Sequence, residues 1–596
     1  MKNIKVLIKN IVAAFLATFA VFNVCGLESG NILLGIVFLA AFYFAGHIRK
    51  NSKKEGVIAI CLALIYTASY AIYVRETIAG GLENKLFAAV YVTFTILGLY
   101  IIFYMAILKI LQFFEKTSYT EGRPDVQNPW KIWAIYTLIL FVCMLPLLIL
   151  NYPGTMTVDS FNQLEQVWGT RAYNDHHPWV HTMIIKFWYD IGYGISGDVY
   201  IGIATYTVFQ MIAVAASVAY AIASLNRAGA GRMCRILVAL GCILYPYNAA
   251  YSITMWKDVL FAACVLAFTV ALYIVVCVKA NSKAAIGDYI VMTISGIGMC
   301  LLRHNGLYAY IGTALVCLVA GLIAAHKNTE KNGCNIRVLI TGAIVFAATV
   351  ITVCIVRGPI TRTNNVIEGE YVYNVCVPLQ QIARVVSDGK EIAQEDRDWL
   401  ERINTIEYIE NNYLPHGADN MFCWVLYGDK DYFYSHKGEF FSLWMRLGLK
   451  YPKEYMEAFF DQTQGYYTTM APEQVAYYGI LPNEDNLEPR PLIAGPLQIK
   501  CNELMDKIYT MFPVYGIMYS MGAVFLLCLL GIGICVVRND YRKIFIFAPV
   551  ILLIGTVVIA TPLVADLRYA FPLMLTMPSL IAMCLHNLRV ENTDRI

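Results

Sequence analysis

The sequence predicts an all-α polytopic membrane protein with about fourteen transmembrane helices. Hydrophobic residues make up 58% of the 596 positions, and charged residues make up only 15%. A soluble domain carries roughly 25% charged residues, so the deficit is large. The mean hydropathy of +0.56 comes from long apolar runs separated by short polar ones, which is typical of membrane proteins. These runs predict that the protein lies in a lipid bilayer. The formal charge of +3 is too small to indicate a nucleic-acid partner.

The apolar runs define the expected spans, because about 20 consecutive apolar residues cross a bilayer as a helix. The run at 235–250 is the weakest candidate, since Pro246 interrupts it. The basic and apolar start of the chain is interpreted as the first span and not as a cleaved signal peptide. The candidate spans are 5–24, 31–48, 57–75, 86–113, 131–150, 199–225, 235–250, 256–278, 288–302, 306–325, 337–356, 513–537, 544–563 and 569–586.

The distribution of Lys and Arg orients these spans, since short cytoplasmic loops are enriched in both. With the N-terminus inside, the even-numbered loops also fall inside, and they hold most of the basic residues. Examples are Arg227, Arg232 and Arg235 in one loop, Arg538, Arg542 and Lys543 in another, and Arg589 and Arg595 in the C-terminal tail. The sequence therefore predicts a multi-pass protein of the plasma membrane with both termini in the cytoplasm.

This map divides the chain into four regions. They are N-terminal helices in 1–130, a transmembrane core in 131–356 with an outer loop at 151–198, an outer domain at 357–512, and C-terminal helices with a cytoplasmic tail in 513–596. The outer domain is acidic and rich in aromatic residues, and its length suits a small soluble domain. Its apolar positions recur at helical spacing, which predicts mainly helical structure. No Cys or His cluster in the sequence has metal-ligand spacing.

The outer loop at 151–198 contains an acidic residue and two histidines close to the expected membrane surface. Asp159 follows directly after the fifth span, and it is either a simple helix N-cap or a functional carboxylate. The helix after it, Phe161 to Trp168, is amphipathic and is expected to lie in the membrane interface. His176 and His177 are either solvated loop residues or groups that handle protons and bind substrate beside Asp159.

Three basic residues stand at tight helix ends on the same outer side, against the general charge trend. They are Lys257 beside Asp258, Arg303 in a tight turn, and Arg568 two residues after Asp566. Each can be a simple interfacial anchor, but Arg and Lys at a membrane rim are also the groups that hold a phosphate. A carboxylate or His as general base, with cations that stabilise a leaving phosphate, suits group transfer from a lipid-phosphate donor.

These residues give the sequence a resemblance to the type-C (GT-C fold) glycosyltransferases, which use polyprenyl-phosphate sugars on the outer or lumenal face. Asp159 matches the acidic residue of their first outer loop, and the Arg568-Tyr569-x-x-Pro572 turn is similar to an element near their last helices. The fuller pattern resembles a largely uncharacterised bacterial family of polytopic membrane proteins in that superfamily. It runs Pro153-Gly154, Asp159, Gln163, His176-His177-Pro178, Trp256-Lys257-Asp258 and Arg303-x-Asn305-Gly306.

The sequence departs from the relatives in one respect. Many of them carry a second acidic residue beside the first, often with a metal, whereas Val158 and Ser160 flank Asp159 here. The departure favours a metal-independent mechanism, with Asp159 as the lone base, over one that uses a divalent metal.

The resemblance implies an inverting membrane glycosyltransferase that moves a sugar from a polyprenyl-phosphate donor to an extracytoplasmic acceptor glycan, such as a cell-wall polysaccharide or teichoic acid. The catalytic residues it implies are Asp159, His176 and His177, and those for the donor phosphate are Lys257, Arg303 and Arg568. Supporting roles fall to Gln163, Asp258, Asn305, Asp566 and Tyr569. A polysaccharide polymerase or ligase, a secondary transporter and an assembly scaffold remain as alternatives.

Overall fold

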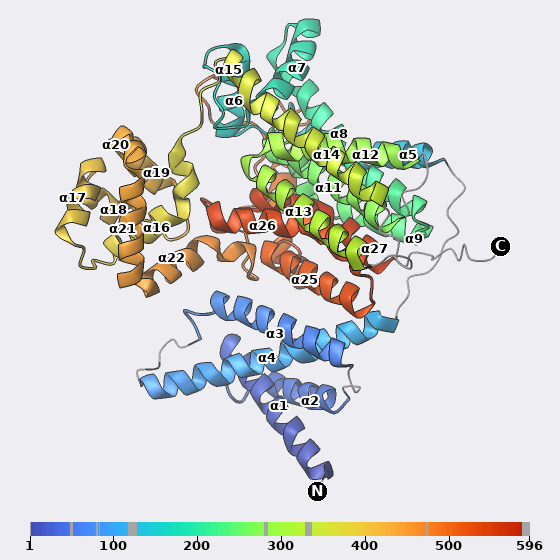
Figure 1. Cartoon of the computed structure of the whole chain (residues 1–596), viewed down its shortest axis with the longest axis vertical. Coiled ribbons are helices and arrows are strands. Elements are labelled where there is room, and N and C mark those ends of the chain that lie inside the picture. The colour runs from blue at the N-terminus through green and yellow to red at the C-terminus, as the bar shows by residue number, and fades with distance from the viewer. Residues whose placement is uncertain are drawn as a thin grey trace.

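The computed structural model describes residues 2–47, 52–78, 82, 84–116, 128–278, 284–327, 336–472 and 475–586. Within these ranges the chain is helical, and its extended segments form only isolated bridges. Ten of the described helices are long and apolar enough to cross a membrane, or eleven if one bent pair counts as a span. The protein is therefore an all-α, multi-pass membrane protein, as the composition predicts (Figure 1).

Most of the expected spans are long helices. They are α1 (Lys2–Val24), α3 (Lys53–Tyr73), α4 (Lys85–Lys116), α5 (Pro129–Leu150), α8 (Val199–Arg227), α11 (Lys257–Cys277), α13 (His304–Lys327), α14 (Ile336–Ile355), α26 (Ala548–Ala560) and α27 (Leu567–Leu585). The 3-10 helix η4 (Tyr541–Phe547) extends α26 to span length. The end of the predicted cytoplasmic tail, with Arg589 and Arg595, lies outside the described residues.

The remaining expected spans are short or broken. The run containing Pro246 forms α9 (Arg232–Ile243) and α10 (Pro246–Ser252), which meet at 64°. Asn248 Nδ2 donates to Cys242 O at 2.8 Å, which satisfies a carbonyl at this break. The others are the shorter apolar helices α2 (Ile32–Gly46) and α25 (Met521–Val537), and α12 (Ala284–Leu302), whose apolar part is Ile286–Leu302. Because their described lengths fall below that of a full span, the count of fourteen stays a prediction.

The core of the protein surrounds α11. In its most apolar stretch 83% of the residues are buried inside the protein, against 17% for α1. A helix that is hydrophobic on every side is stable only where other helices or lipid cover it completely. Here α8, α12 and α27 pack around α11 and provide that cover. The position of α11 matters for the site, because the helix begins at Lys257.

The first four helices form a group of their own at the bottom of Figure 1. α1 packs on α2 and α4, and α3 packs on α4. The backbones of α1 and α4 come so close that a side chain at Gly98 would overlap Leu16 O. α25 packs on α3 and α4, and Arg75 forms an ion pair with Asp461, so these two contacts join the group to the rest of the chain.

The helices at the left of Figure 1, from α16 to α22, form a compact unit that we call the side domain. Its own hydrophobic cluster is drawn from residues between Val372 and Tyr455, and Trp424 and Phe433 lie at its centre. The chain after Thr463 packs into the core of the long helices instead. The structural unit is therefore shorter than the predicted domain at 357–512.

The helices of the side domain and of the segments on either side of it are short. Those of the side domain are η2 (Tyr371–Val375), α16 (Cys376–Ser387), α17 (Gln394–Ile403), α18 (Ile406–Asn412), α19 (Asp419–Leu426), α20 (Lys430–Ser435), α21 (Lys437–Lys450) and α22 (Pro452–Thr463). Before it lie η1 (Val356–Ile360) and α15 (Thr361–Thr363), and after it lie η3 (Gln464–Tyr466), α23 (Pro496–Met511) and α24 (Pro513–Ile517).

The first outer loop of the sequence map folds into α6 (Val158–Trp168) and α7 (Trp179–Ser196). The apolar side of α6 faces the protein, where Phe161, Leu164 and Val167 are buried in the main core. Protein therefore covers this apolar side, and the position of α6 at the membrane interface stays a prediction.

Short backbone pairings fasten the segment before α6. Thr155 N donates to Ile253 O at 2.8 Å, and Met255 N donates to Thr155 O at 3.0 Å. On its other side, Met156 N donates to Gly479 O at 3.0 Å. The segments that precede α6 and α11 are thus held side by side, and the chain returning from the side domain pairs with the first of them.

Two further backbone hydrogen bonds attach the side domain and the segment that leads into it to the rest of the chain. Asp175 N, in the loop between α6 and α7, donates to Ile367 O at 2.8 Å. Ala418 N, just before α19, donates to Pro562 O at 2.8 Å. The side domain therefore touches the loops that precede α7 and α27, and its return segment touches the loop that precedes α6.

Close packing at Gly465 maintains one of these attachments. A side chain there would overlap Val564 O and the Cβ of Ala565, in the loop before α27. We expect Gly465→Ala to lower the midpoint of thermal unfolding, because overpacking against backbone costs roughly 1–3 kcal/mol. Gly438→Ala is the control, since a Cβ at that helical position meets open space and Ala favours a helix by about 1 kcal/mol. Tryptophan fluorescence of the detergent-solubilised protein measures both, and equal midpoints for the two variants would contradict this packing.

Candidate functional site

Asp159 lies in the first turn of α6 and points toward α27. The N-cap position of α6 belongs to Thr157, whose backbone N–H donates to Ser160 Oγ at 3.1 Å. Asp159 is therefore not the cap of this helix. Its Oδ2 accepts a hydrogen bond from Arg568 Nη1 at 2.8 Å, and Lys257 Nζ lies 3.9 Å from the same oxygen. The structure thus brings three of the predicted site residues together from distant parts of the sequence.

Arg568 is held in place from several directions. Asp566 caps α27 by accepting from Arg568 N at 2.9 Å, and its carboxylate lies 3.5 Å from Arg568 Nε. Arg568 Nη2 donates to the Tyr569 hydroxyl at 2.9 Å, and the guanidinium lies 5.0 Å from the centre of the Trp256 ring. A guanidinium fixed in this way presents its donors in one direction, which suits recognition of a carboxylate or phosphate.

Arg303 is the second arginine of the site, and it faces Asp258. Its Nη1 lies 2.5 Å from Asp258 Oδ1, and its guanidinium lies 4.8 Å from the centre of the Tyr569 ring. Asp258 is only 1% exposed, and Arg303 is 8% exposed. Arg568 Nε lies 3.9 Å from the other oxygen of Asp258. A charge buried so deeply requires an opposite charge nearby, and here two guanidinium groups share that role.

We call these residues together the ionic cluster: Asp159, His177, Lys257, Asp258, Arg303, Asp566 and Arg568. Its three cations face its three aspartates, so the predicted cations are not free but already paired. Four helices begin here: α6 at Val158, α11 at Lys257, α13 at His304 and α27 at Leu567. Each helix N-terminus carries roughly half a positive charge, so the cluster can accept a further anion.

The surroundings of Asp159 keep its carboxylate ionised. Burial by itself would raise the pKa of Asp159, but Lys257 and Arg568 outweigh burial and hold that pKa well below its ordinary value of 3.8. The nearby His177 and His176 act in the same direction. A carboxylate in this state is a weak base, so it gains basicity only when the two cations move away from it.

His177 is a neutral histidine between Lys257 and Asp159. Lys257 Nζ donates to His177 Nδ1 at 2.7 Å, which leaves the ring proton on Nε2, 3.8 Å from Asp159 Oδ1. Burial, and then the charge of Lys257, hold the pKa of His177 well below 6.5. His177 therefore orients Lys257 and presents an N–H toward Asp159, and it does not add a positive charge to the cluster.

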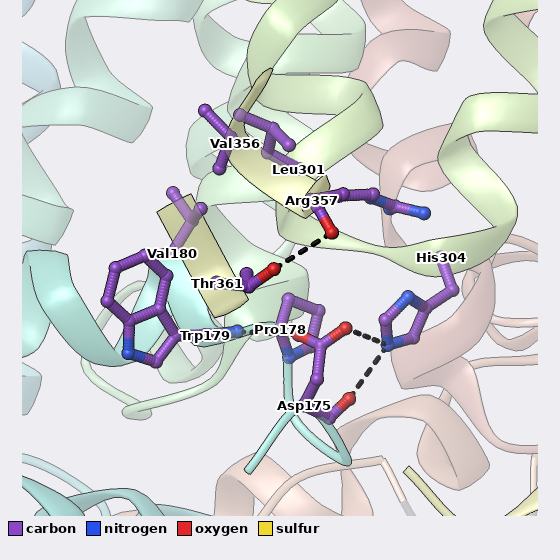
Figure 2. Close-up of a pocket in the computed structure, with 9 residues that line it drawn as sticks. All are labelled: Asp175, Pro178, Trp179, Val180, Leu301, His304, Val356, Arg357 and Thr361. Atoms are coloured by element: carbon purple, nitrogen blue, oxygen red, sulfur yellow. Dashed lines mark hydrogen bonds and ion pairs between the residues drawn. The ribbon is translucent and has the colours of Figure 1, made fainter. Parts of the chain in front are cut away.

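His176 stands at the edge of the ionic cluster. Its ring lies 4.5 Å from the ring of His177 and 4.7 Å from that of Tyr373 in the side domain. The loop that carries both histidines is anchored by Asp175, whose backbone O accepts from His304 Nε2 at 3.0 Å. Figure 2 shows His304 directed at Asp175, beside Pro178 and Thr361, where these residues line a small pocket.

Two predicted supporting residues lie outside the ionic contacts. Gln163 Nε2 donates to Thr182 Oγ1 at 2.9 Å, and its Oε1 lies 2.9 Å from His181 Nδ1, so it joins α6 to α7. Asn305 Nδ2 donates to Thr556 Oγ1 at 3.2 Å, which joins α13 to α26. Both residues position helices whose ends form the site.

No group of three or more His, Cys, Asp or Glu side chains is arranged to hold a metal ion in the ranges that the structure describes.

A family model described as a family of unknown function, DUF6020, matches residues 169–595. The chain belongs to the DUF6020 family. No curated protein and no solved structure matches the chain. The DUF6020 match contains His177, Lys257, Arg303 and Arg568, whereas Asp159 lies ten residues before it.

The structure of this DUF6020 protein adds site residues that the sequence did not single out for this role. Trp256 supports Arg568, and its Nε1 donates to Thr157 Oγ1 at 2.8 Å, beside Asp159. Tyr477 lies 5.9 Å, ring to ring, from Trp256. Asp419 of the side domain also lies within electrostatic range of Arg568 and Asp159. Of these three residues, only Trp256 could have been found from the sequence, because it stands beside Lys257. Tyr477 and Asp419 lie in segments whose contacts depend on the tertiary fold.

The neutral state of His177 predicts a pH dependence of stability. Because the pKa of His177 is below 6.5 in the folded protein, the unfolded chain binds a proton that the folded chain excludes. The free energy of unfolding is therefore highest above about pH 6.5 and falls at lower pH. We expect the unfolding midpoint to drop between pH 7.5 and 5.5, and His177→Gln to reduce that slope. One excluded proton is worth about 1.4 kcal/mol per pH unit. Identical slopes for the native protein and the variant would contradict a neutral, buried His177.

Proposed function

We propose that the protein is a membrane glycosyltransferase of the GT-C type, which transfers a sugar from a polyprenyl-phosphate donor to an extracytoplasmic acceptor glycan. One observation carries this proposal: Asp159 lies within 4 Å of both Arg568 and Lys257, at the N-terminal ends of two long apolar helices. A carboxylate that can act as a base thus lies beside cations that can bind a phosphate.

The donor phosphate would take over the cations that now face Asp159. Arg568 and Lys257 have Asp159 as a shared partner, and Asp159 is the most exposed of the carboxylates that face them, at 29%. A phosphate that enters from this side competes with Asp159 and leaves the buried pair of Asp258 and Arg303 intact. The N-terminal ends of α11 and α27, which are the positive ends of their helix dipoles, would also attract this phosphate.

This exchange links donor binding to catalysis. Once Arg568 and Lys257 hold the phosphate, the pKa of Asp159 rises toward its ordinary value, and the carboxylate can accept a proton. An acceptor hydroxyl then attacks the anomeric carbon, the bond from that carbon to the phosphate oxygen breaks, and the polyprenyl phosphate leaves with the bonding electrons. Asp159 takes the hydroxyl proton, and the configuration at the anomeric carbon is inverted.

Aromatic side chains would bind the sugars. Trp256 and Tyr477 lie on one side of Arg568, and Tyr373 lies beside His176 at the edge of the cluster. Flat aromatic faces pack against the C–H surfaces of sugar rings, while the polar groups around them accept hydroxyl hydrogen bonds. His176 and His177, both with lowered pKa because of burial, would orient the acceptor as neutral groups.

The proposal also includes the orientation of the protein in the membrane. The charge pattern of the loops supports a plasma-membrane protein with cytoplasmic termini, and it puts the ionic cluster and the side domain on the outer side. A polysaccharide polymerase or ligase would use the same cations but a lipid-linked oligosaccharide as donor. A transporter or an assembly scaffold would not need a carboxylate base among these cations.

The test is mass spectrometry of the cell-surface polysaccharide from cells that make the native protein, no protein, or Asp159→Asn at matched membrane levels. We expect one glycosyl substituent to fall at least about a hundredfold in the last two, because a general base contributes 10²–10⁴-fold. The lost mass distinguishes a single sugar from an oligosaccharide repeat. Asp566→Asn is the matched control, since Asn caps a helix as well as Asp does, and it should lose less than about tenfold. A substituent that persists in Asp159→Asn would refute the catalytic assignment.

A further inference from the structure

The side domain places one carboxylate, that of Asp419, beside the ionic cluster. Gly417 forms a bridge with Leu563, and Ala418 N donates to Pro562 O at 2.8 Å. These contacts hold the start of α19 against the loop that leads into Asp566 and Arg568. Asp419 is the first residue of α19, and it interacts electrostatically with both Arg568 and Asp159.

Aromatic packing fixes the direction of this part of the side domain. Phe422, one turn after Asp419, packs its ring 4.9 Å from that of Tyr373. Tyr373 in turn lies 4.7 Å from His176, ring to ring, and it interacts electrostatically with Asp419. Tyr373 therefore lies near both Asp419 and His176, at the edge of the ionic cluster.

Asp419 differs from the aspartates of the ionic cluster. Asp159, Asp258 and Asp566 each lie within 4 Å of a guanidinium group. In the part of the chain that the structure describes, the Asp419 carboxylate forms no such ion pair and no hydrogen bond. Burial raises the pKa of Asp419, Arg568 at longer range lowers it, and the negative charge of Asp159 raises it, with a net increase. Asp419 is exposed, so its carboxylate oxygens are accessible to the hydroxyl groups of a ligand.

The site thus has two chemically different halves. The ends of the long helices supply Lys257 and Arg568, which suit an anionic phosphate. The side domain supplies Asp419, which would repel a phosphate but accept hydrogen bonds from hydroxyl groups. Two carboxylate oxygens can accept from neighbouring hydroxyls of one sugar ring, and Tyr373 offers an aromatic face at the same edge.

We propose that Asp419 and Tyr373 form the acceptor half of the site, in which Asp419 binds hydroxyl groups of a neutral, polyhydroxylated acceptor such as a glycan terminus. This assignment rests on the proposed glycosyl transfer and specifies its acceptor side. It gives the side domain a direct part in the reaction: the domain brings the acceptor hydroxyl to the donor that the helix ends hold.

The competing explanation is that Asp419 only stabilises α19. An acidic residue in the first turn interacts favourably with the helix dipole, and α19 is only eight residues long. Asp431 offers a matched control, since it lies in the first turn of α20, the next helix of the same domain, and is exposed. A purely structural role predicts the same small effect for Asp419→Asn and Asp431→Asn in every measurement.

The experiment has two arms, both on the full-length protein. In the first, surface-glycan mass spectrometry compares Asp419→Asn and Asp431→Asn with the native protein and with cells that lack it. In the second, the purified protein in nanodiscs is titrated with undecaprenyl phosphate, which probes the phosphate half alone. We expect Asp419→Asn to lose the glycosyl substituent at least about tenfold, yet to bind undecaprenyl phosphate about twofold or more tightly, because a negative charge near Arg568 is gone. Asp431→Asn should match the native protein in both arms.

Each outcome has one meaning. If Asp419→Asn keeps the substituent while Asp159→Asn loses it, the acceptor assignment is wrong and the transferase stands. If Asp419→Asn loses undecaprenyl-phosphate binding as Arg568→Gln should, Asp419 supports the phosphate half or the fold, and the assignment also fails. If cells without the protein show no glycan change, the proposed function itself is overturned, and the acceptor role falls with it.

Discussion

The ion pair between Arg568 and Asp159 joins parts of the chain that are 409 positions apart. It closes a set of contacts in which Arg568 also faces Asp258 and Asp566. Both side chains are partly buried, so removing one partner would leave the other charge without its nearest opposite charge. The starting ends of α6, α11 and α27 must therefore meet at one point, and the packing of these helices around α11 follows from that requirement as much as from their apolar surfaces.

The side domain is part of this arrangement and not an appendage. Its entry segment pairs with the histidine loop through Ile367, its interior pairs with the loop before α27 through Ala418, and its return segment pairs with the loop before α6 through Gly479. The first of these loops carries His177, and the other two lead into the helices that carry Arg568 and Asp159. The side domain and its flanking segments thus contact the chain beside three of the site residues.

The sequence predicted most of the charged residues that lie together in the ionic cluster, but not which of them form ion pairs with one another. Hydropathy located the helices, and the unusual polar residues at helix ends identified Asp159, His177, Lys257, Arg303 and Arg568. It could not show that Arg303 faces Asp258 while Lys257 faces Asp159 and His177, because those choices depend on helix rotation and tilt. For the same reason the sequence could not show that protein covers the apolar side of α6: periodicity identifies an apolar side, but it does not say whether protein or lipid covers it. Asp419 carried no signal at all, since only the contact of α19 with the loop before α27 brings it to the site.

The charge balance of the ionic cluster has a consequence for a transferase that holds a reactive lipid-linked sugar. Three cations face three aspartates in the ionic cluster, and Lys257 and Arg568 hold the pKa of Asp159 well below its ordinary value. Under the proposed function, Asp159 becomes a stronger base only when a phosphate replaces it as the partner of Arg568 and Lys257. If the proposed function holds, the base is therefore switched on by the donor itself, at the moment when the sugar is in place. Water that reaches the site before the donor meets a carboxylate that cannot activate it, and afterwards the acceptor bound on the opposite side competes with water for the same base.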